Sequence, residues 1–581
     1  MPFSSLKGRK LMLVKMVYHP MPFSSNNKDG IKEKDYLSVV YRDLVTDKTE
    51  IFIIEEPTIE IFVVKPEYRT FRSPVHFIEM DKCDRKVVKY NRVKYEIAKI
   101  GGEGLLKQYR ELSDKKQIFK YPYVLGGDID IETYYRTLWE IQCGNDIRKI
   151  PNTTFMDIEV DQIDYTGAMA KHGECEINAI AFIDNTSNTV YQFLYDNGKN
   201  PLIKDFMERQ DEYQKMLHEA FDEFYGVLDY KILMYENEVD MLIDFFKLVH
   251  TLKRDMMLIW NGFGFDIPYI MDRFKTLQIS PMSVMCSNEF PRRFMHLYSD
   301  FSSFDFATKK DSFIISDVTN YVDQTITYAA LRKSKGVIRK VSLGYVSEHE
   351  LKDTKLDYKD VGNIRTLPYE DYFRFSMYNI KDTLLQKGID NKCKDTENLY
   401  LISNINCVSL SDALKQTVVF RGFMYSRFYQ KGIILGHNVN YDNENNPELA
   451  NISFEGALVS DPLLNTHTGL NIYNGKSKYL FGYTIDFDFK AMYPNMIVVF
   501  NIFATTLIGK LYIEPKYMVD YIGSDVGEGN DVVNNLPDSG VLGKDYVEDL
   551  IAKNVINLGS KWHKLSTISE LDKKIKMLGV A

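Results

Sequence analysis

The pattern of apolar and polar positions divides the chain into two kinds of sequence. From residue 35 to about residue 99, short runs such as YLSVVYRDLV, TEIFIIEE and TIEIFVV follow one another. Alternation with a period of two is typical of strands that bury one face. Further on, apolar strand-like runs alternate with amphipathic helical runs. The pattern therefore predicts a β-rich N-terminal region followed by an α/β region.

The α/β region predicts a definite order of elements. The strand ECEINAIAFID is expected to run antiparallel into TVYQFLYD, and one long amphipathic helix is expected over residues 204–225. The helix ENEVDMLIDFFKLVHTL then precedes the buried strand MMLIWN. Two further runs predict helices, DYFRFSMYNIKDTLLQKGID and, after residue 400, SDALKQTVVFRGFMYSRFYQ.

The first residues contain a short repeat, because MPFSS occurs at residues 1–5 and again at residues 21–25. We interpret the first fifteen or so residues as an upstream extension, with the start of the protein near Met16, and leave them out of the fold prediction. A chance repeat is the alternative. The apolar run at residues 11–14 is too short to be the core of a signal peptide.

Composition narrows the class of protein. A chain of 581 residues exceeds a single core, and a prior of about 150 residues per domain predicts three or four domains. The net charge of −9 argues against a chain that is basic throughout, so nucleic-acid contact would use local basic patches. The six cysteines form no C-x-x-C pair, which predicts reduced thiols in a cytosolic protein and no zinc site. No apolar run approaches the roughly 20 residues of a membrane span.

Residues 154–160, TFMDIEV, predict a buried strand that carries two acids. Because strand side chains alternate, Asp157 and Glu159 lie on the same side. Two carboxylates among apolar residues are costly to bury unless a positive charge lies between them, and a divalent metal with oxygen ligands is the usual solution. The alternative is two acids on the wet face of a strand. Upstream, Asp128, Asp130 and Glu132 are expected to cap the helix TYYRTLWEIQ.

Two later motifs add candidate residues. WNGFGFDIPYI places Asp266 shortly before Pro268 and a helical run, so Asp266 is either a functional acid or a helix N-cap. Tyr378 and Asp382 are four residues apart in a predicted helix and therefore share one face. An exposed Tyr–Asp pair on a solvated face is the alternative for these two residues.

The three motifs follow one another in a fixed order, as F-x-D-x-E, N-x-x-x-F-D-x-P-Y-I and Y-x-x-x-D. Together with VSLGYVSEHELKDTKLDY ahead of YNIKD, they resemble the 3′–5′ proofreading exonuclease of family B DNA polymerases, above all the large phage replicative enzymes. The resemblance implies a ribonuclease H-like domain with two divalent metals, Mg²⁺ or Mn²⁺. Two metals about 3.5–4 Å apart can supply a hydroxide and stabilise the leaving oxygen of a phosphodiester.

The resemblance also assigns roles to particular residues. Tyr378 would orient the attacking water, and Asn261 and Phe265 would bind the substrate, with Asn261 at its 3′ end. The metal ligands would be Asp157, Glu159, Asp266 and Asp382.

A second site is indicated by YTIDFDFKAMYPNMIVVFNI, in which Asp486 and Asp488 share one strand face and Pro494 opens a helix. DFKAMYPN resembles the first palm motif of the same family, usually D-x-x-S-L-Y-P-S, with Ala491 and Asn495 in place of the serines. A structural strand-to-helix turn is the alternative.

By that match, Asp488 is a catalytic ligand of Mg²⁺ at a polymerase site. Phe489 would offer its backbone carbonyl, and Tyr493 would pack under the sugar of the incoming nucleotide. Upstream, Gly456 and Ala457 resemble the small-residue hinge that joins the exonuclease and polymerase regions in this family.

The remainder of the family's polymerase site does not occur in the sequence. Neither the Y-x-D-T-D hairpin nor a finger helix of the K-x-x-x-N-S-x-Y-G type is present, and residues 521–525 lie in an acidic, glycine-rich loop that we reject as a substitute. One palm aspartate cannot hold two metals, so this chain alone is not expected to synthesise DNA. We favour the N-terminal subunit of a split polymerase, completed by a second polypeptide, over a truncated chain.

The predicted architecture is multidomain, α/β and α+β. Residues 1–125 form a β-rich N-terminal domain and residues 126–395 a ribonuclease H-like 3′–5′ exonuclease domain. Residues 396–455 form a helical segment that packs back on the N-terminal domain, and residues 456–581 an incomplete polymerase palm. The alternative functions are a truncated or stand-alone 3′–5′ exonuclease of DNA and a DNA-binding module with a vestigial site.

The expected partners are primer–template and single-stranded DNA, dNTP and a second polymerase subunit, with a sliding clamp left open as a further partner. We expect no membrane association and a cytoplasmic location, which would be the host cytoplasm if the protein is viral. A DNA-facing role and an ordinary solvated face both remain open for one basic cluster. Its members are Arg332, Lys333, Lys335, Arg339 and Lys340.

Overall fold

The computed structural model describes residues 2–20, 34–69, 77–112, 115–144, 150–301, 303, 305–333 and 340–436, and a few short stretches further along the chain. The chain divides into two units, of which the first contains Met1–Arg69 and Val75–Val439. The second contains Thr70–Pro74 and Asn440–Ala581. The predicted hinge and the palm residues Asp486, Asp488, Phe489, Tyr493 and Pro494 lie outside the described residues.

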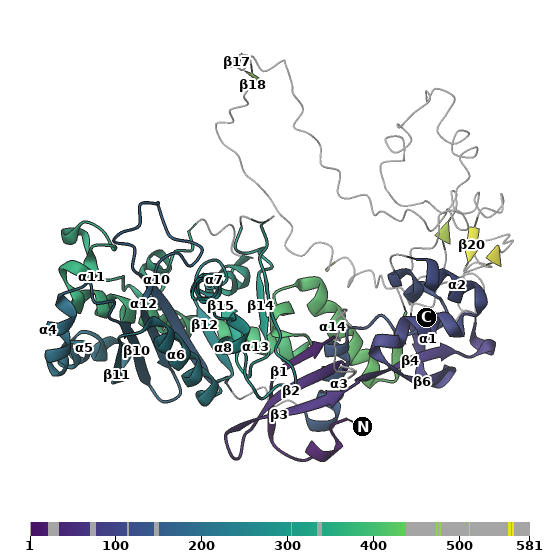
Figure 1. The fold of residues 1–581 in the computed structure, drawn as a ribbon. Helices are drawn as coiled ribbons and strands as arrows, with labels where there is room; N and C mark the ends of the chain where they lie inside the picture. The colour runs from purple at the N-terminus through teal and green to yellow at the C-terminus, as the bar shows by residue number, and fades with distance from the viewer. Residues whose placement is uncertain are drawn as a thin grey trace. The chain divides into compact units, whose positions relative to one another are not determined.

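The N-terminal part is built from short strands, as its alternating pattern predicts (Figure 1). The strands β1 (Leu11–His19), β2 (Tyr36–Asp43) and β3 (Lys48–Glu55) form an antiparallel sheet in that order. A second sheet has the order β6-β4-β7, with β4 at Thr58–Val64, β6 at Cys83–Lys89 and β7 at Val124–Leu125. The helices are α1 (Val93–Ile100), α2 (Glu103–Glu111) and α3 (Ile131–Cys143).

The helix α3 begins where the acidic comb predicts. The side chain of Asp130 accepts a hydrogen bond from the Thr133 amide at 3.0 Å, which is the N-cap interaction. Glu132 instead accepts from the Tyr18 amide at 3.0 Å, so it joins the helix to β1. Burial raises the pKa of Glu132 to about 8.

The first residues are part of the fold, so leaving them out of the fold prediction was wrong. Strand β1 pairs with β2 along its whole length, and Phe3, Leu11 and Leu13 are buried in the same hydrophobic core. The Lys15 ammonium donates to the carbonyl oxygens of Ile315, Asp317 and Thr319 at 2.9–3.0 Å. The apolar run at residues 11–14 is the first half of β1, an edge strand whose side chains are nevertheless buried.

The α/β part is organised around a six-stranded sheet with the order β11-β10-β9-β8-β12-β15. Strand β9 runs antiparallel to both β8 and β10, as predicted for the β9–β10 pair, whereas β12 is parallel to β8 and β15. The strands are β8 (Thr153–Val160), β9 (Ile177–Asp184), β10 (Thr189–Tyr195), β11 (Asp229–Tyr235), β12 (Met256–Ile259) and β15 (Asn320–Asp323).

Helices cover both faces of this sheet, and alternate residues of β8 belong to different cores. Phe155 packs in a core with residues of α5 (Gln210–Tyr225) and α12 (Tyr372–Cys393). Met156 and Ile158 pack in the other core, with residues of α6 (Glu238–Leu252) and α7 (Asp266–Thr276). The alternation places Asp157 and Glu159 on the α12 side of the sheet.

The single helix expected over residues 204–225 is two helices. Helix α4 (Leu202–Glu208) ends at Arg209, whose φ of −112° and ψ of 30° interrupt the helix before α5 begins. The Arg209 guanidinium contacts Asp205 at 2.9 Å and Glu212 at 2.8 Å, so it bridges the two helices. The apolar period continues across the break, which explains why the sequence pattern does not reveal it.

The remaining helices of the first unit are α8 (Pro281–Met285), α9 (Gln324–Leu331), α10 (Leu343–Leu351), α11 (Leu367–Glu370), α13 (Asp395–Ile405) and α14 (Gln416–Gln430). Its remaining strands are β5 (Phe77–Glu79), β13 (Met295–Tyr298), β14 (Ser312–Ile315) and β16 (Ile433–Leu435), with β13 paired to β14 and β5 to β16. Its 3₁₀ helices are η1 (Ser4–Leu6), η2 (Pro66–Tyr68), η3 (Met80–Lys82), η4 (Tyr90–Arg92), η5 (Lys115–Lys120), η7 (Lys359–Val361) and η8 (Leu410–Asp412).

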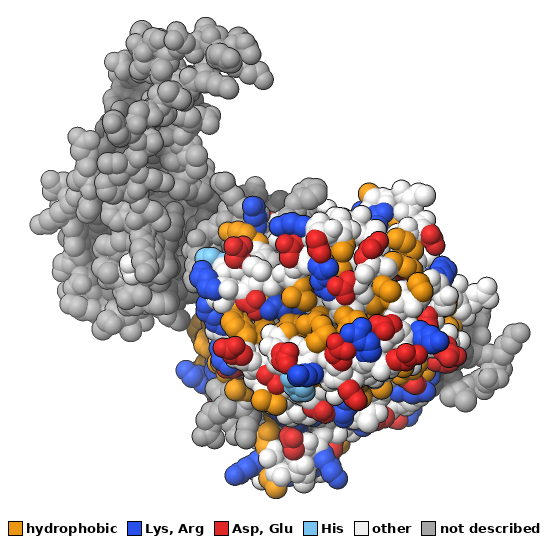
Figure 2. Space-filling view, turned by 90° about the vertical axis from the view of Figure 1, so that its left-hand side faces the viewer, with side chains coloured by type: hydrophobic (Ala, Val, Ile, Leu, Met, Phe, Trp, Pro, Cys, Tyr) orange, Lys and Arg blue, Asp and Glu red, His pale blue; other side chains and the backbone are white. Residues whose placement is uncertain are grey.

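The described stretches of the second unit are short strands, namely β17 (Ile472–Tyr473), β18 (Lys476–Ser477), β19 (Lys510–Leu511), β20 (Ile556–Leu558) and β21 (Lys561–Trp562). All six cysteines of the chain are free thiols. Within the described part of the chain, no helix combines the length and the apolar character that crossing a bilayer requires. On the face shown in Figure 2, acidic and basic side chains are interspersed.

Candidate metal-binding active site

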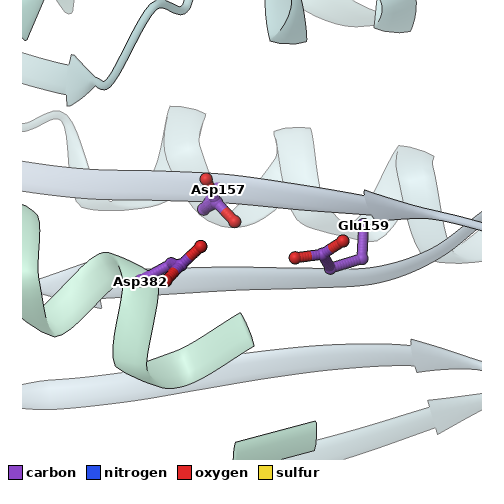
Figure 3. A group of neighbouring side chains, drawn as sticks. All are labelled: Asp157, Glu159 and Asp382. Atoms are coloured by element: carbon purple, nitrogen blue, oxygen red, sulfur yellow. The ribbon is translucent and has the colours of Figure 1, made fainter. Parts of the chain in front are cut away.

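Three carboxylates meet beside the central sheet, and two of them come from one strand. Asp157 and Glu159 project from β8, and Asp382 projects toward them from α12 (Figure 3). One oxygen of each carboxylate lies within 4.8 Å of the others. Asp382 is buried, whereas Asp157 and Glu159 are half-buried. The structure thus brings together residues that are 225 positions apart in the sequence (157 and 382).

Hydrogen bonds from α12 hold this helix against β8. The amide nitrogen of the Asn379 side chain donates to the backbone oxygen of Asp157 at 3.3 Å. About two helical turns further on, the Gln386 side chain donates to the backbone oxygen of Met156 at 3.3 Å. Both amides are fully buried, so these bonds replace hydration that the β8 carbonyls have lost. They fix the height of Asp382 along the strand.

The fourth predicted acid lies beside this group without being a member of it. Asp266 is the first residue of α7, with Phe265 rather than Asp266 at the N-cap position. Its carboxylate accepts a long hydrogen bond, 3.4 Å, from the amide of Ile158, the residue between Asp157 and Glu159. Asp266 is 4% exposed, so it is a buried acid next to β8. The N-cap alternative is therefore wrong for Asp266.

The electrostatics of the site favour protonation of its acids. Burial is the main cause that raises the pKa of Asp157 well above its usual value, and the negative charges of Asp382 and Asp266 raise it further. Burial, followed by Asp382, raises the pKa of Glu159 to about 8, and burial raises the pKa of Asp266 to about 7. Burial also raises the pKa of Asp382. Like charges confined in a poorly hydrated space cause such shifts, and a bound cation would reverse them.

The donor set fits a hard divalent cation. Carboxylate oxygens are the ligands that Mg²⁺ and Mn²⁺ prefer, and three of them lie within 4.8 Å of one another. In addition, Oδ1 of Asp382 is buried and has no hydrogen-bond partner in the described part of the chain. A buried acceptor that is left free in this way is costly unless another group binds it. The residues present are therefore consistent with a metal held by Asp157, Glu159 and Asp382.

A lysine that the sequence analysis missed also belongs to this site. The Lys355 ammonium lies 2.5 Å from Oδ2 of Asp382 and 3.2 Å from the hydroxyl of Tyr378. Burial alone would lower the pKa of Lys355, but Asp382, Tyr378 and Asp157 raise it above its ordinary value. The residue stands in VSLGYVSEHELKDTKLDY, a segment that already carries the family resemblance. Because this segment contains both Lys352 and Lys355, the sequence alone does not single out Lys355.

Tyr378 lies where its spacing from Asp382 predicts, and it is not the exposed residue of the alternative interpretation. It is 5% exposed, and its ring packs edge-on against Tyr358 with 5.6 Å between centroids. Burial, followed by Asp382, raises the pKa of its hydroxyl, so the group stays protonated at neutral pH. The hydroxyl can therefore both donate and accept a hydrogen bond at the edge of the acid group.

The predicted substrate residues lie on the loop between β12 and α7. Asn261 has a left-handed φ of 58°, and its backbone amide donates to the Thr325 hydroxyl at 2.8 Å. A Cβ on Gly264 would come within 2.5 Å of the Asn261 side-chain oxygen, so a larger residue there would displace the Asn261 side chain. Phe265 is half-buried and packs against Tyr269. The loop thus presents a preformed surface next to Asp266.

One member of the basic cluster, Arg332, is paired within the fold. The Arg332 guanidinium contacts Asp395 at 2.9 Å and lies 3.8 Å from the ring centroid of Tyr328, so it is used within the fold. Lys333 and Lys340 are also described, whereas Lys335 and Arg339 lie outside the described residues. A DNA-facing role for the cluster stays a prediction.

Comparison with known proteins shows which kind of domain this part of the chain resembles. The model of the exonuclease domain of DNA polymerase family B matches residues 129–332. This range contains Asp157, Glu159 and Asp266, all six strands of the central sheet, and the loop with Asn261 and Phe265. Residues 129–332 are therefore similar to the exonuclease domain of DNA polymerase family B.

Individual relatives extend the similarity beyond this range. The DNA-directed DNA polymerase of Enterobacteria phage T4 is 24% identical over 452 residues, which cover 74% of this chain and 45% of the relative. That of Escherichia phage RB69 is 23% identical over 426 residues, 72% of this chain and 42% of the relative. The DNA polymerase delta catalytic subunit of Candida albicans is 23% identical over 296 residues, 49% and 25% respectively. The chain thus spans less than half the length of these relatives.

Proposed function

We propose that this chain is a metal-dependent 3′–5′ exonuclease of DNA and the N-terminal part of a family B replicative polymerase. The observation that carries the proposal is the meeting of Asp157, Glu159 and Asp382 within 4.8 Å. Asp157 and Glu159 lie within residues 129–332, which match this family's exonuclease domain, and Asp382 follows that range. The strand order, with one antiparallel strand among parallel ones, agrees with the ribonuclease H-like fold expected for such a domain.

In this proposal Asp157, Glu159 and Asp382 hold a divalent cation, and Asp266 contributes from α7 to a second one. Mg²⁺ or Mn²⁺ bound there supplies a Lewis acid for the charge that develops on a phosphodiester and on its leaving oxygen. The side chains of Asp157 and Glu159 are only half-buried, which leaves the site open to a DNA end from the solvent side.

The surrounding residues position the substrate and the water in this proposal. The protonated Tyr378 hydroxyl orients the attacking water by accepting or donating a hydrogen bond at the edge of the acid group. The Lys355 ammonium, 3.2 Å from that hydroxyl, places a positive charge where the phosphate approaches. Asn261 holds the 3′ end, and Phe265 packs against the terminal nucleotide, which single-stranded DNA presents without a pairing partner.

The direct test is the double variant Asp157→Ala, Glu159→Ala. With Mg²⁺ or Mn²⁺ and a 5′-labelled single-stranded oligonucleotide, we expect wild-type protein to shorten the strand from its 3′ end. The double variant should lose at least about 10³-fold in rate, because the cation loses two of its ligands.

The exposed acid Glu219 provides the matched control, since among the described residues it pairs with Lys215, which is also exposed. Glu219→Gln should degrade DNA at the wild-type rate. Full activity in the Asp157, Glu159 double variant, with both proteins folded by circular dichroism, would contradict the proposal. Strand shortening from the 5′ end would contradict its direction.

We further propose that Asp488, Phe489 and Tyr493 form one half of a polymerase site that a second chain completes. The support is the DFKAMYPN motif in a sequence that contains neither the second aspartate hairpin nor the finger helix. Mixing this chain with a polypeptide that carries those motifs should produce primer extension from dNTP, and Asp488→Ala should stop it. Primer extension by this chain alone would contradict the need for a partner.

A further inference from the structure

The loop that carries Lys355 has no regular secondary structure. It leaves α10 at Leu351 and reaches the short η7 helix at Lys359. A lysine side chain is a flexible four-carbon stem that carries about 2 kcal/mol of rotamer entropy. Its ammonium therefore stays in one place only if the backbone that carries it is also fixed. Two sets of contacts fix this loop, one on each side of Lys355.

The first anchor is Asp353, two residues before Lys355. Its Oδ2 accepts a hydrogen bond from the Tyr225 hydroxyl at 2.5 Å and one from the Lys381 ammonium at 2.6 Å. The side chain of Lys381 is 9% exposed, and its ammonium also lies 5.0 Å from the centroid of the Tyr225 ring. Burial alone would raise the pKa of Asp353, but the bonds from Lys381 and Tyr225 lower it, so the carboxylate is ionised.

The second anchor is Asp360, five residues after Lys355. Both of its carboxylate oxygens accept from the Arg374 guanidinium, at 2.7 Å and 2.9 Å, which is the bidentate geometry that fixes orientation as well as distance. Between the anchors, the Tyr358 ring packs against Tyr378.

All of these partners except Tyr225 come from α12. Arg374, Tyr378, Lys381 and Asp382 are spaced four, three and one residues apart, which places them along one face of that helix. The same face that delivers Asp382 to the acid group therefore also holds the Lys355 loop at two points. A displacement of the loop would move the ammonium away from both Tyr378 and Asp382.

We infer that Asp353 and Asp360 are positioning residues that clamp the Lys355 loop onto α12 and so hold the Lys355 ammonium in the nuclease site. The inference rests on the proposed exonuclease function. Neither aspartate touches the acid group itself, and each acts only through Lys355.

The test is a double-mutant cycle between Asp353 and Lys355. We expect Asp353→Asn and Lys355→Ala each to lower kcat on single-stranded DNA about tenfold, with KM within about twofold, because the charge is misplaced by an ångström or more. Since Asp353 acts through Lys355, the combined variant should be no slower than Lys355→Ala alone. Asp353→Glu, which keeps the carboxylate, should recover most of the rate, and Asp360→Asn should reproduce the loss.

A second measurement does not depend on catalysis. In metal-free protein without DNA, the Lys355 ammonium competes with an added cation for Asp382, so Mn²⁺ followed by electron paramagnetic resonance should bind several-fold more tightly to Lys355→Ala. Asp353→Asn should shift Mn²⁺ affinity in the same direction, with no further shift when combined with Lys355→Ala. Asp205→Asn, which breaks an exposed ion pair on α4, is the control and should change neither kcat on single-stranded DNA nor the affinity for Mn²⁺.

The inference would be overturned if the losses of kcat from Asp353→Asn and Lys355→Ala added up in the combined variant. It would also be overturned if Asp353→Asn left the Mn²⁺ affinity unchanged. A wild-type protein without nuclease activity would instead overturn the proposed function, and the Mn²⁺ cycle would still decide whether the clamp exists. Melting temperatures of all variants exclude unfolding as the cause of a lost rate.

Discussion

Two groups of buried charge lie on opposite sides of the same sheet, and they are balanced very differently. On the α6–α7 side, Arg273 and Glu238 form a complete pair, with Nε and Nη2 of the arginine 2.6–3.1 Å from the carboxylate. The Ile177 amide adds a third donor to Glu238, and the backbone oxygen of Gly173 accepts from Arg273. On the α12 side, Asp157, Glu159 and Asp382 face one ammonium, that of Lys355.

The difference separates charges that hold the fold from charges to which the proposed function assigns a reaction. The Arg273–Glu238 pair satisfies its own hydrogen bonds, and each charge is buried together with its counter-charge. The acid group has an excess of negative charge, and Oδ1 of Asp382 has no hydrogen-bond partner in the described part of the chain. Burial raises the pKa values of Glu159 and Asp382. Buried carboxylates without enough counter-charge lower the stability of the fold. Such destabilising groups are typical of functional sites.

The largest expected effect on stability concerns the balanced pair, Arg273 and Glu238. Glu238→Gln leaves the Arg273 guanidinium buried without a counter-charge, and we expect a loss of about 3–5 kcal/mol in the free energy of unfolding. Urea or thermal denaturation measures this loss. Glu219→Gln, at an exposed ion pair, should change the free energy by less than about 0.5 kcal/mol. A similar small change for Glu238→Gln would remove the distinction between the two groups.

A smaller effect is expected where β1 meets the base of the β13–β14 hairpin. Lys15→Met removes the donor for three backbone oxygens, and we expect a loss of about 1–3 kcal/mol, measured by the same denaturation experiments. Lys10→Met, at an exposed lysine five residues earlier, is the matched control. If both variants unfold like the wild type, the N-terminal strand contributes less to the fold than its burial indicates.

The smallest effect, and the one of opposite sign, is expected at the acid group. With a chelator present, the isosteric variant Asp157→Asn, Glu159→Gln should be more stable than the wild type by on the order of 1 kcal/mol. The folded pKa values of these acids are raised, that of Glu159 from 4.5 to about 8, so folded protein binds more protons than unfolded protein in this interval. Stability of the wild type therefore falls as the pH rises toward 8.

The variant lacks these titrations, so its advantage in melting temperature should be larger at pH 8 than at pH 6. Saturating Mn²⁺ should remove the advantage by stabilising the wild type alone. An advantage that is the same at both pH values would show that packing, and not charge, limits the stability of this side of the sheet.

Much of this arrangement could be predicted from local pattern. Strand alternation places Asp157 and Glu159 together, and the four-residue spacing places Tyr378 with Asp382, because both rules depend only on backbone geometry. The position of Asp266 relative to these three acids could not be predicted in the same way. Its side chain lies near β8 but outside the group of three, a distance that depends on how α7 packs against the sheet.

Other features escaped the sequence analysis for identifiable physical reasons. The position of Lys355 depends on tertiary contacts made by Asp353 and Asp360, which an irregular loop does not reveal through any period. The break at Arg209 interrupts hydrogen bonding without interrupting the apolar pattern. The apolar run at residues 11–14 does not by itself reveal that β1 is buried, because its burial depends on pairing with β2 and on contacts with residues far along the chain.

The pairing of β5 with β16 has a consequence for biosynthesis. Ile78 lies opposite Ile434, and both side chains share a small core with Phe62 and Val64 of β4. A ribosome must therefore translate more than 350 further codons, including all of the nuclease domain, before Ile78 meets its partner (from 78 to 434). Until then one edge of the nascent N-terminal region is open, so co-translational folding of this region finishes after that of the domain it precedes.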